Sequence, residues 1–144
     1  MSSLSHEDLT CAVCGQIASR VLLQSSNTIE PPDFDTRPGE MMRSTLYYWV
    51  MDCPHCGYAA PDIRESDARA AGIVRTEQYQ RHRSDETLPA DARRFACHAY
   101  LLEQIGQYAD AGWTALNAAW MCDDRRDDVA ARHCRAEAIR LWKL

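Results

Sequence analysis

Long hydrophobic runs are missing from this sequence. The longest strongly apolar run, residues 46–51, is far shorter than the roughly 20 residues that a membrane-spanning helix needs. Residues 1–8 are polar and acidic, whereas a secretory signal has a basic start followed by an apolar stretch. We therefore expect neither a membrane span nor a signal peptide, and we expect the protein to be cytoplasmic.

Basic charge is also scarce. Lysine occurs once, beside 15 arginines, and the formal net charge is −5. Residues 1–60 carry three basic and seven acidic side chains, a balance of −4, and residues 61–144 carry 13 and 14, a balance of −1. Nucleic-acid-binding proteins usually display a basic surface. We therefore expect no nucleic-acid partner, although the arginines leave room for a local patch.

No recognisable set of catalytic residues stands out, and we expect a protein that is not an enzyme. The length of 144 residues suits one ordinary domain or two small ones. A hydrophobic content of 46% and a charged content of 26% are typical of a soluble globular protein. Seven cysteines, an odd number without a secretory signal, indicate a reducing compartment in which thiols bind metal or stay free.

Two short cysteine motifs dominate what is present. Residues 11–15 read CAVCG and residues 53–57 read CPHCG, and 38 residues (15–52) separate the two cysteine pairs. The glycine after each second cysteine can adopt positive φ, which lets backbone N–H groups approach the sulfurs. Two such turns are typical of one tetrahedral zinc site with four thiolate ligands. The predicted ligands of this structural Zn²⁺ are Cys11, Cys14, Cys53 and Cys56.

Other interpretations of the two motifs stay open. Each CxxC could be a redox pair, although neither opens a helix after a buried strand. The cysteines could form structural disulfides, or they could hold iron, which also accepts four thiolates. His55 is an alternative ligand, but we expect it at the exposed tip of the second turn. A zinc ion with four thiolates has no open position for water, which favours a structural role.

The first 62 residues predict a small antiparallel sheet around the metal. Two strand–turn–strand units that share one ion are typical of a rubredoxin-like zinc ribbon, which we assign to residues 1–62. Residues 46–52, with their aromatic and β-branched side chains, are the clearest strand. We expect further strands over residues 16–23 and 58–60, a solvated loop over residues 25–40 and a frayed lead-in over residues 1–10.

Residues 63–144 predict a helical bundle, which makes the whole chain α+β. Three well-marked helices carry apolar side chains at helical spacing, among them Trp113, Leu116 and Trp120. Helix pairs joined by short turns and rich in alanine resemble tetratricopeptide hairpins, although the repeat consensus is not met. We expect these helices over residues 91–104, 109–122 and 127–142, and weaker ones over residues 67–71 and 76–83 with Gly72 between them.

Three cysteines lie outside the motifs, at Cys97, Cys122 and Cys134. Two of them adjoin histidines, so a second metal site is conceivable. Adjacent residues on a helix point in different directions, however, and none of the three has ligand spacing. We expect buried free thiols, which behave as small apolar side chains.

The motifs resemble one known family. Residues 47–59, YYWVMDCPHCGYA, together with the first CxxCG motif, resemble the DUF2225 family of bacterial proteins of unknown function. The helical part is similar too, at YADAGW (108–113), AAWMCDD (118–124) and AARHCRA (130–136). The likeness runs from about residue 11 to residue 141. It implies a zinc ribbon joined to a tetratricopeptide-like segment, with metal on the four cysteines, and it implies no reaction.

Three functions compete at this point. The leading hypothesis is a zinc-binding, non-enzymatic adaptor whose helices bind a protein partner. The second is a nucleic-acid-binding zinc ribbon, which the charge balance opposes. The third is a thiol redox switch or an enzyme that uses zinc-bound cysteines.

Overall fold

The chain begins with an extended hairpin. The computed structural model describes residues 2–144, in which strand β1 (Ser3–Thr10) pairs antiparallel with β2 (Ile17–Ser25). The expected strand near residues 16–23 is therefore confirmed, whereas the frayed lead-in over residues 1–10 is wrong for residues 3–10, and Met1 lies outside the described residues. Leu9 is the buried residue of β1, so this polar, mostly exposed strand carries little of the alternation that reveals strands.

The loop over residues 25–40 is confirmed as irregular but is not simply solvated. Its Arg37 is buried and donates from Nη2 to Asp124 at 2.8 Å. Its Asp35 accepts hydrogen bonds from Trp120 Nε1 at 2.8 Å and from Arg135 at 2.9 Å. These contacts hold the loop against the last two helices of the chain.

The expected strand over residues 46–52 is wrong for most of its length. Residues Met42–Tyr48 form a 3₁₀ helix, η1, and only Met51–Asp52 extend as strand β3. Arg94 from the helical part explains the difference, since it donates to the carbonyl oxygens of Tyr47 at 2.5 Å and Val50 at 2.7 Å. These tertiary contacts override the strand preference of the aromatic residues, which depends strongly on context.

The second small sheet pairs β3 with β4 (Ala59–Ala60), antiparallel and two residues long. The expected strand over residues 58–60 is confirmed at its last two residues. Since β3 and β4 flank the second cysteine motif directly, their pairing closes the base of that turn.

Five helices follow, and the three long predictions are confirmed to within two residues at each end. Pro89 is the N-cap of the first long helix, and Asp127 accepts from the Ala130 N–H at the start of the last one. Of the two weaker predictions, the helix over residues 76–83 is confirmed from residue 77. The helix expected over residues 67–71 lies instead at Ala70–Val74, so Gly72 lies inside a helix rather than between two helices. The helices are α1 (Ala70–Val74), α2 (Glu77–Arg83), α3 (Ala90–Gln104), α4 (Tyr108–Asp124) and α5 (Asp128–Trp142).

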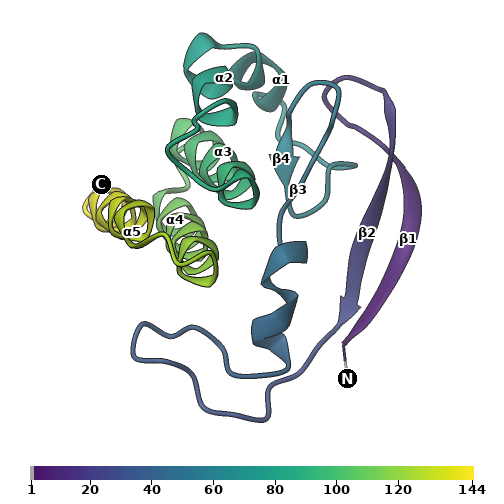
Figure 1. Ribbon diagram of the computed structural model, residues 1–144. Helices are drawn as coiled ribbons and strands as arrows, with labels where there is room; N and C mark the ends of the chain where they lie inside the picture. The colour runs from purple at the N-terminus through teal and green to yellow at the C-terminus, as the bar shows by residue number, and fades with distance from the viewer. Residues whose placement is uncertain (1) are drawn as a thin grey trace.

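The long helices lie side by side in one layer, with the β1–β2 hairpin on the far side of the molecule and β3, β4 and η1 between them (Figure 1). Small buried residues of α4, such as Ala115 and Ala119, let its neighbours approach closely. Trp113, expected on the apolar stripe of this helix, is 46% exposed and packs instead against Trp142, with ring centroids 5.1 Å apart.

Contacts cross the boundary predicted at residue 62. Trp49 packs edge-on against Trp120, with ring centroids 6.4 Å apart. Buried residues of both parts belong to one continuous hydrophobic cluster that runs from Leu9 to Leu141. The division into a zinc ribbon (1–62) and a helical bundle (63–144) therefore stays a prediction, and the two segments share one hydrophobic core.

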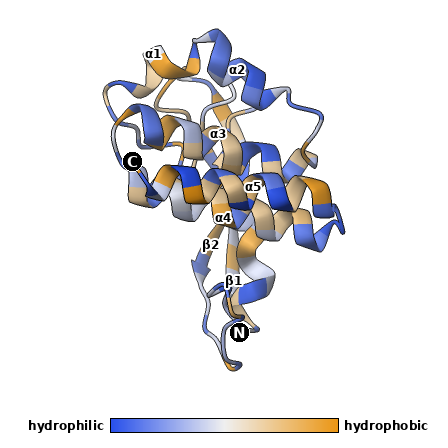
Figure 2. Cartoon of the chain, turned by 90° about the vertical axis from the view of Figure 1, so that its left-hand side faces the viewer, coloured by the Kyte–Doolittle hydropathy of each residue, from blue (hydrophilic) through white to orange (hydrophobic). Residues whose placement is uncertain are grey.

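From the side of α5, hydrophilic and hydrophobic residues alternate along that helix (Figure 2). Within residues 2–144, no helix combines the length and the apolar character that crossing a bilayer requires.

Candidate metal centre

Two backbone turns of the same design carry the four motif cysteines. In the first turn, the Gly15 N–H donates to the Cys11 carbonyl at 2.8 Å, and the Cys11 N–H donates to the Gln16 carbonyl at 2.9 Å. In the second turn, the Gly57 N–H donates to the Cys53 carbonyl at 2.9 Å, and the Cys53 N–H donates to the Tyr58 carbonyl at 2.8 Å. Each turn therefore presents its two sulfurs from a closed backbone loop.

The glycines of both turns adopt the left-handed conformation expected from the sequence. Gly15 has φ +76° and Gly57 has φ +84°, a region that other residues rarely occupy. At Gly57 a second constraint applies, because an added Cβ would lie 2.5 Å from Cδ of Arg83. The Arg83 side chain thus lies directly against the second turn and donates from Nη2 to the Pro54 carbonyl at 3.4 Å.

The fold brings the four sulfurs together. Sγ of Cys11 lies 3.7 Å from Sγ of Cys56, Sγ of Cys14 lies 3.6 Å from Sγ of Cys53, and all four ligand atoms lie within 4.8 Å of one another. A tetrahedral ion with metal–sulfur bonds of about 2.3 Å requires sulfurs about 3.8 Å apart. The residues present therefore fit a four-coordinate metal, and the protein has a tetracysteine cluster that can hold an ion.

The electrostatics of the cluster depend on burial and on backbone N–H groups. Cys11 and Cys53 are buried, whereas Cys14 is exposed and Cys56 is intermediate. Burial raises the pKa of the Cys11 and Cys56 thiols, even though the Tyr58 N–H donates to Cys56 Sγ at 3.4 Å. Burial acts on Cys53 as well, but the N–H groups of Cys56 and His55 outweigh it and lower its pKa.

The other candidate residues lie away from the cluster. His55 is exposed, as expected, and its Nε2 lies 3.3 Å from the Ile17 carbonyl oxygen. Cys97, Cys122 and Cys134 are buried free thiols within the helical part. Over residues 2–144 no second group of three or more metal-ligating side chains is found.

Tyr79 supports the centre from outside, and sequence reasoning missed it. This fully buried side chain on α2 donates to the Gly57 carbonyl at 2.8 Å and accepts from the Ala59 N–H at 2.9 Å. Burial raises the pKa of Tyr79, so its hydroxyl keeps the proton that it donates. The one available signal was a lone aromatic residue in an otherwise polar helix, EQYQRHR.

The tetracysteine cluster on paired turns, followed by a helical layer, defines an α+β protein with a candidate metal centre. The family model described as "Uncharacterized protein conserved in bacteria (DUF2225)" matches residues 4–144, essentially the whole chain. The chain therefore belongs to the DUF2225 family, as its motifs indicated. Searches of curated proteins and of solved structures found no match.

Proposed function

We propose that the four motif cysteines hold one structural Zn²⁺ ion, in a rubredoxin-like ribbon. The observation that carries this proposal is the spacing of the sulfurs, all within 4.8 Å of one another. Thiolate sulfur suits the borderline-soft zinc ion. A dication also stabilises the thiolate forms that burial disfavours, because a coordinated thiol loses its proton.

Zinc is preferred here to iron, which four thiolates also bind. Zinc is a d¹⁰ ion without redox chemistry, so it suits a centre whose task is to hold two turns together. Four protein thiolates occupy all its positions and leave none for water or substrate. We therefore propose that the protein is not an enzyme.

The helical layer would supply the interaction surface of this module. Its α4–α5 pair, joined by three residues and packed through alanines, supports a tetratricopeptide-like arrangement. A cavity of about 460 Å³ is lined from α2, α3, α4 and α5. Its small apolar lining residues are Ala96, Ala99, Ala115 and Ala118, and its charged ones are Asp85, Glu103, Glu137 and Arg140.

The charges of this groove, meaning the cavity just described, indicate what would fill it. Arg140 is already paired with Glu103 at 2.9 Å and with Glu137, which leaves an excess of negative charge. An apolar segment of a partner protein that carries Lys or Arg would complement both the lining and the charge. The proposed function is thus a zinc-stabilised adaptor that binds such a segment.

A basic nucleic-acid surface has little support, because the exposed arginines are mostly engaged. We propose that nucleic acid is not a partner, and a salt-sensitive gel shift at moderate ionic strength would contradict this. The arginines paired with carboxylates include Arg20, Arg37, Arg43, Arg64, Arg69, Arg81, Arg125, Arg135 and Arg140.

We also propose a division of roles at residue 62, with residues 1–62 as the metal-held part and residues 63–144 as the interaction part. Seven free cysteines support a reducing compartment, and we propose the cytoplasm.

Blocking the groove tests the adaptor role. Ala96→Arg places a long basic side chain in the groove from a half-buried helical position. Ala136→Arg makes the same change on an exposed face of α5 outside it. Affinity capture from native cells should recover the same proteins with the wild type and Ala136→Arg, and lose at least one with Ala96→Arg. Equal recovery with both variants, at equal metal content, would contradict the adaptor proposal.

A further inference from the structure

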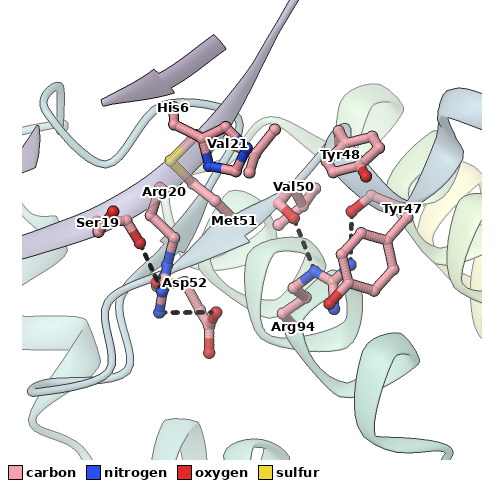
Figure 3. A pocket seen from close by; sticks show the side chains of 10 residues that line it. All are labelled: His6, Ser19, Arg20, Val21, Tyr47, Tyr48, Val50, Met51, Asp52 and Arg94. Carbon is pink, nitrogen blue, oxygen red and sulfur yellow. Dashed lines mark hydrogen bonds and ion pairs between the residues drawn. The ribbon is translucent and has the colours of Figure 1, made fainter. Parts of the chain in front are cut away.

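A second cavity, separate from the groove and from the cysteines, lies where the β1–β2 hairpin faces α3. It has a volume of about 290 Å³ and is lined from β1, β2, η1, β3 and α3. Figure 3 shows Arg20 on one side of it and Arg94 on the other, with Val50 and Met51 between them. Two guanidinium groups thus share one small space in a protein whose net charge is −5.

Neither guanidinium group is fully neutralised. Arg94 forms no ion pair within residues 2–144, and its hydrogen bonds run from Nε and Nη2 to the carbonyl oxygens of Val50 and Tyr47. Arg20 donates from Nε to the Asp52 carbonyl at 2.8 Å and from Nη1 to the Ser19 carbonyl at 3.0 Å. Its one carboxylate contact, from Nη2 to Asp52, is long at 3.7 Å. Carbonyl oxygens accept hydrogen bonds but carry no net charge, so positive charge remains.

Arg94, which lines the cavity, also retains donor capacity. Its Nη1 makes no hydrogen bond in the part of the chain that the structure describes, while an arginine offers five N–H groups in a planar fork. The Tyr47 ring lies under the guanidinium, 4.3 Å from Cζ to the ring centroid, and fixes its plane. A preorganised, stacked guanidinium is the group that best recognises a carboxylate.

Beside the two arginines, the lining has an apolar and aromatic part, with Val21, Val50, Met51 and the ring of Tyr48, and a polar part made of His6, Ser19 and Asp52. An inorganic anion would leave the apolar and aromatic side chains of the lining without a contact. A ligand that joins one negative charge to an apolar body would use both kinds of surface, which is how small-molecule sites are commonly built.

We propose that this cavity binds a small organic carboxylate with an aromatic or aliphatic body, its carboxylate held between Arg94 and Arg20. Burial lowers the pKa of Arg94, while the nearby carboxylates of Asp52 and Asp91 act in the opposite direction, as a bound carboxylate would. The site is distinct from the metal centre and from the groove, since it shares no lining residue with either.

Nuclear magnetic resonance on the full chain tests the proposal with defined probes. Benzoate should shift the Arg94 Nε–H signal and the Met51 methyl signal in a saturable manner, while benzyl alcohol and inorganic phosphate should not. N-acetylphenylalanine, compared with benzoate, distinguishes a chain-terminal carboxylate from a free small acid, and its C-terminal amide shows whether the carboxylate is required. Saturable binding of either carboxylate supports the site. No saturable shift with either one, or equal shifts with benzyl alcohol or phosphate, would overturn it.

A matched pair of variants locates the binding. Arg94→Lys keeps the charge but loses the planar fork and should weaken benzoate at least about tenfold. Arg93→Lys is the control, because Arg93 also donates to backbone carbonyls, those of Asp85 and Leu88, but lies outside the cavity. Should Arg94→Lys fail to fold, Arg20→Gln replaces it, with the same expected direction. Equal affinity in the wild type and in the folded cavity variant would overturn the assignment.

Discussion

The two segments of this chain obtain their order by different means. In the hairpin at its start, Leu9 is the buried residue of β1 and Ala18 that of β2. In α4, by contrast, most residues from Ala111 to Cys122 are buried. Burying apolar surface contributes roughly 25 cal/mol per Å², so the helices can supply much of their own stability and the hairpin cannot. The hairpin depends on the tetracysteine cluster and on contacts with η1 and β3.

The largest expected effect comes from removing one cysteine of the tetracysteine cluster, on which the hairpin depends. Cys53→Ser removes a ligand and should abolish metal binding and unfold the ribbon, since structural zinc is worth on the order of 10–16 kcal/mol in small domains. Cys122→Ser is the matched control, because both thiols have 0% exposure. It should lower the free energy of unfolding by only about 1 kcal/mol. Hydrogen exchange of β1 and β2, together with the metal content, should be measured for both variants. Equal loss of protection and of metal in the two variants would contradict the assignment.

A second prediction concerns the link between the two segments. Tyr79→Phe removes the hydroxyl that bonds Gly57 and Ala59, and it leaves two buried backbone groups without a partner. The free energy of unfolding should fall by about 1–3 kcal/mol. Tyr100→Phe is the control, since its hydroxyl donates to the exposed Gln78. Chemical denaturation of both variants decides the matter, and similar losses would show that Tyr79 does not support the second turn specifically.

A third prediction compares two glycines within helices. An added Cβ at Gly112 would lie 2.2 Å from Nε1 of Trp142, so Gly112→Ala must displace that ring and should cost about 1 kcal/mol or more. At Gly72 nothing lies within 4 Å, and Gly72→Ala should stabilise the protein by about 0.5–1 kcal/mol. Thermal unfolding should therefore move in opposite directions for the two changes. Shifts of the same sign would contradict the packing described around Trp142.

The smallest expected effect is a pH dependence of the loop over residues 25–40. Burial raises the pKa of Asp35, but the hydrogen bonds from Arg135 and Trp120 outweigh it and hold the pKa below its ordinary 3.8. The folded form therefore favours the carboxylate, and this contribution is present above pH 3.8 and disappears as the pH falls through the lowered value. Asp35→Asn should destabilise the loop by about 1 kcal/mol at pH 7 and less at pH 3. Hydrogen exchange of the loop at both values checks this, and a pH-independent difference would count against it.

The sequence predicted those features that local chemistry determines. The CxxCG spacing is sufficient to specify each cysteine turn, because the turn and its glycine lie within five residues. The long helices could be predicted for the same reason, from the helical spacing of their apolar side chains.

The features that were missed depend on distant partners. Arg94, more than 40 residues later, binds the carbonyl groups of Tyr47 at the end of η1 and of Val50 just beyond it, and no pattern within residues 42–52 contains that information. Strand β1 was not predicted because it is stabilised by pairing with β2, while most of its side chains stay exposed and show no apolar pattern. Tyr79 was missed because its partners are backbone atoms of the second cysteine turn.

The most direct test is the metal content of the full chain, purified without added metal and measured by elemental mass spectrometry. We predict about one zinc per chain in the wild type and in Cys122→Ser, and none in Cys53→Ser. An intact fold without metal, with the four motif thiols free, would contradict the zinc centre and return the two CxxC pairs to consideration as redox groups.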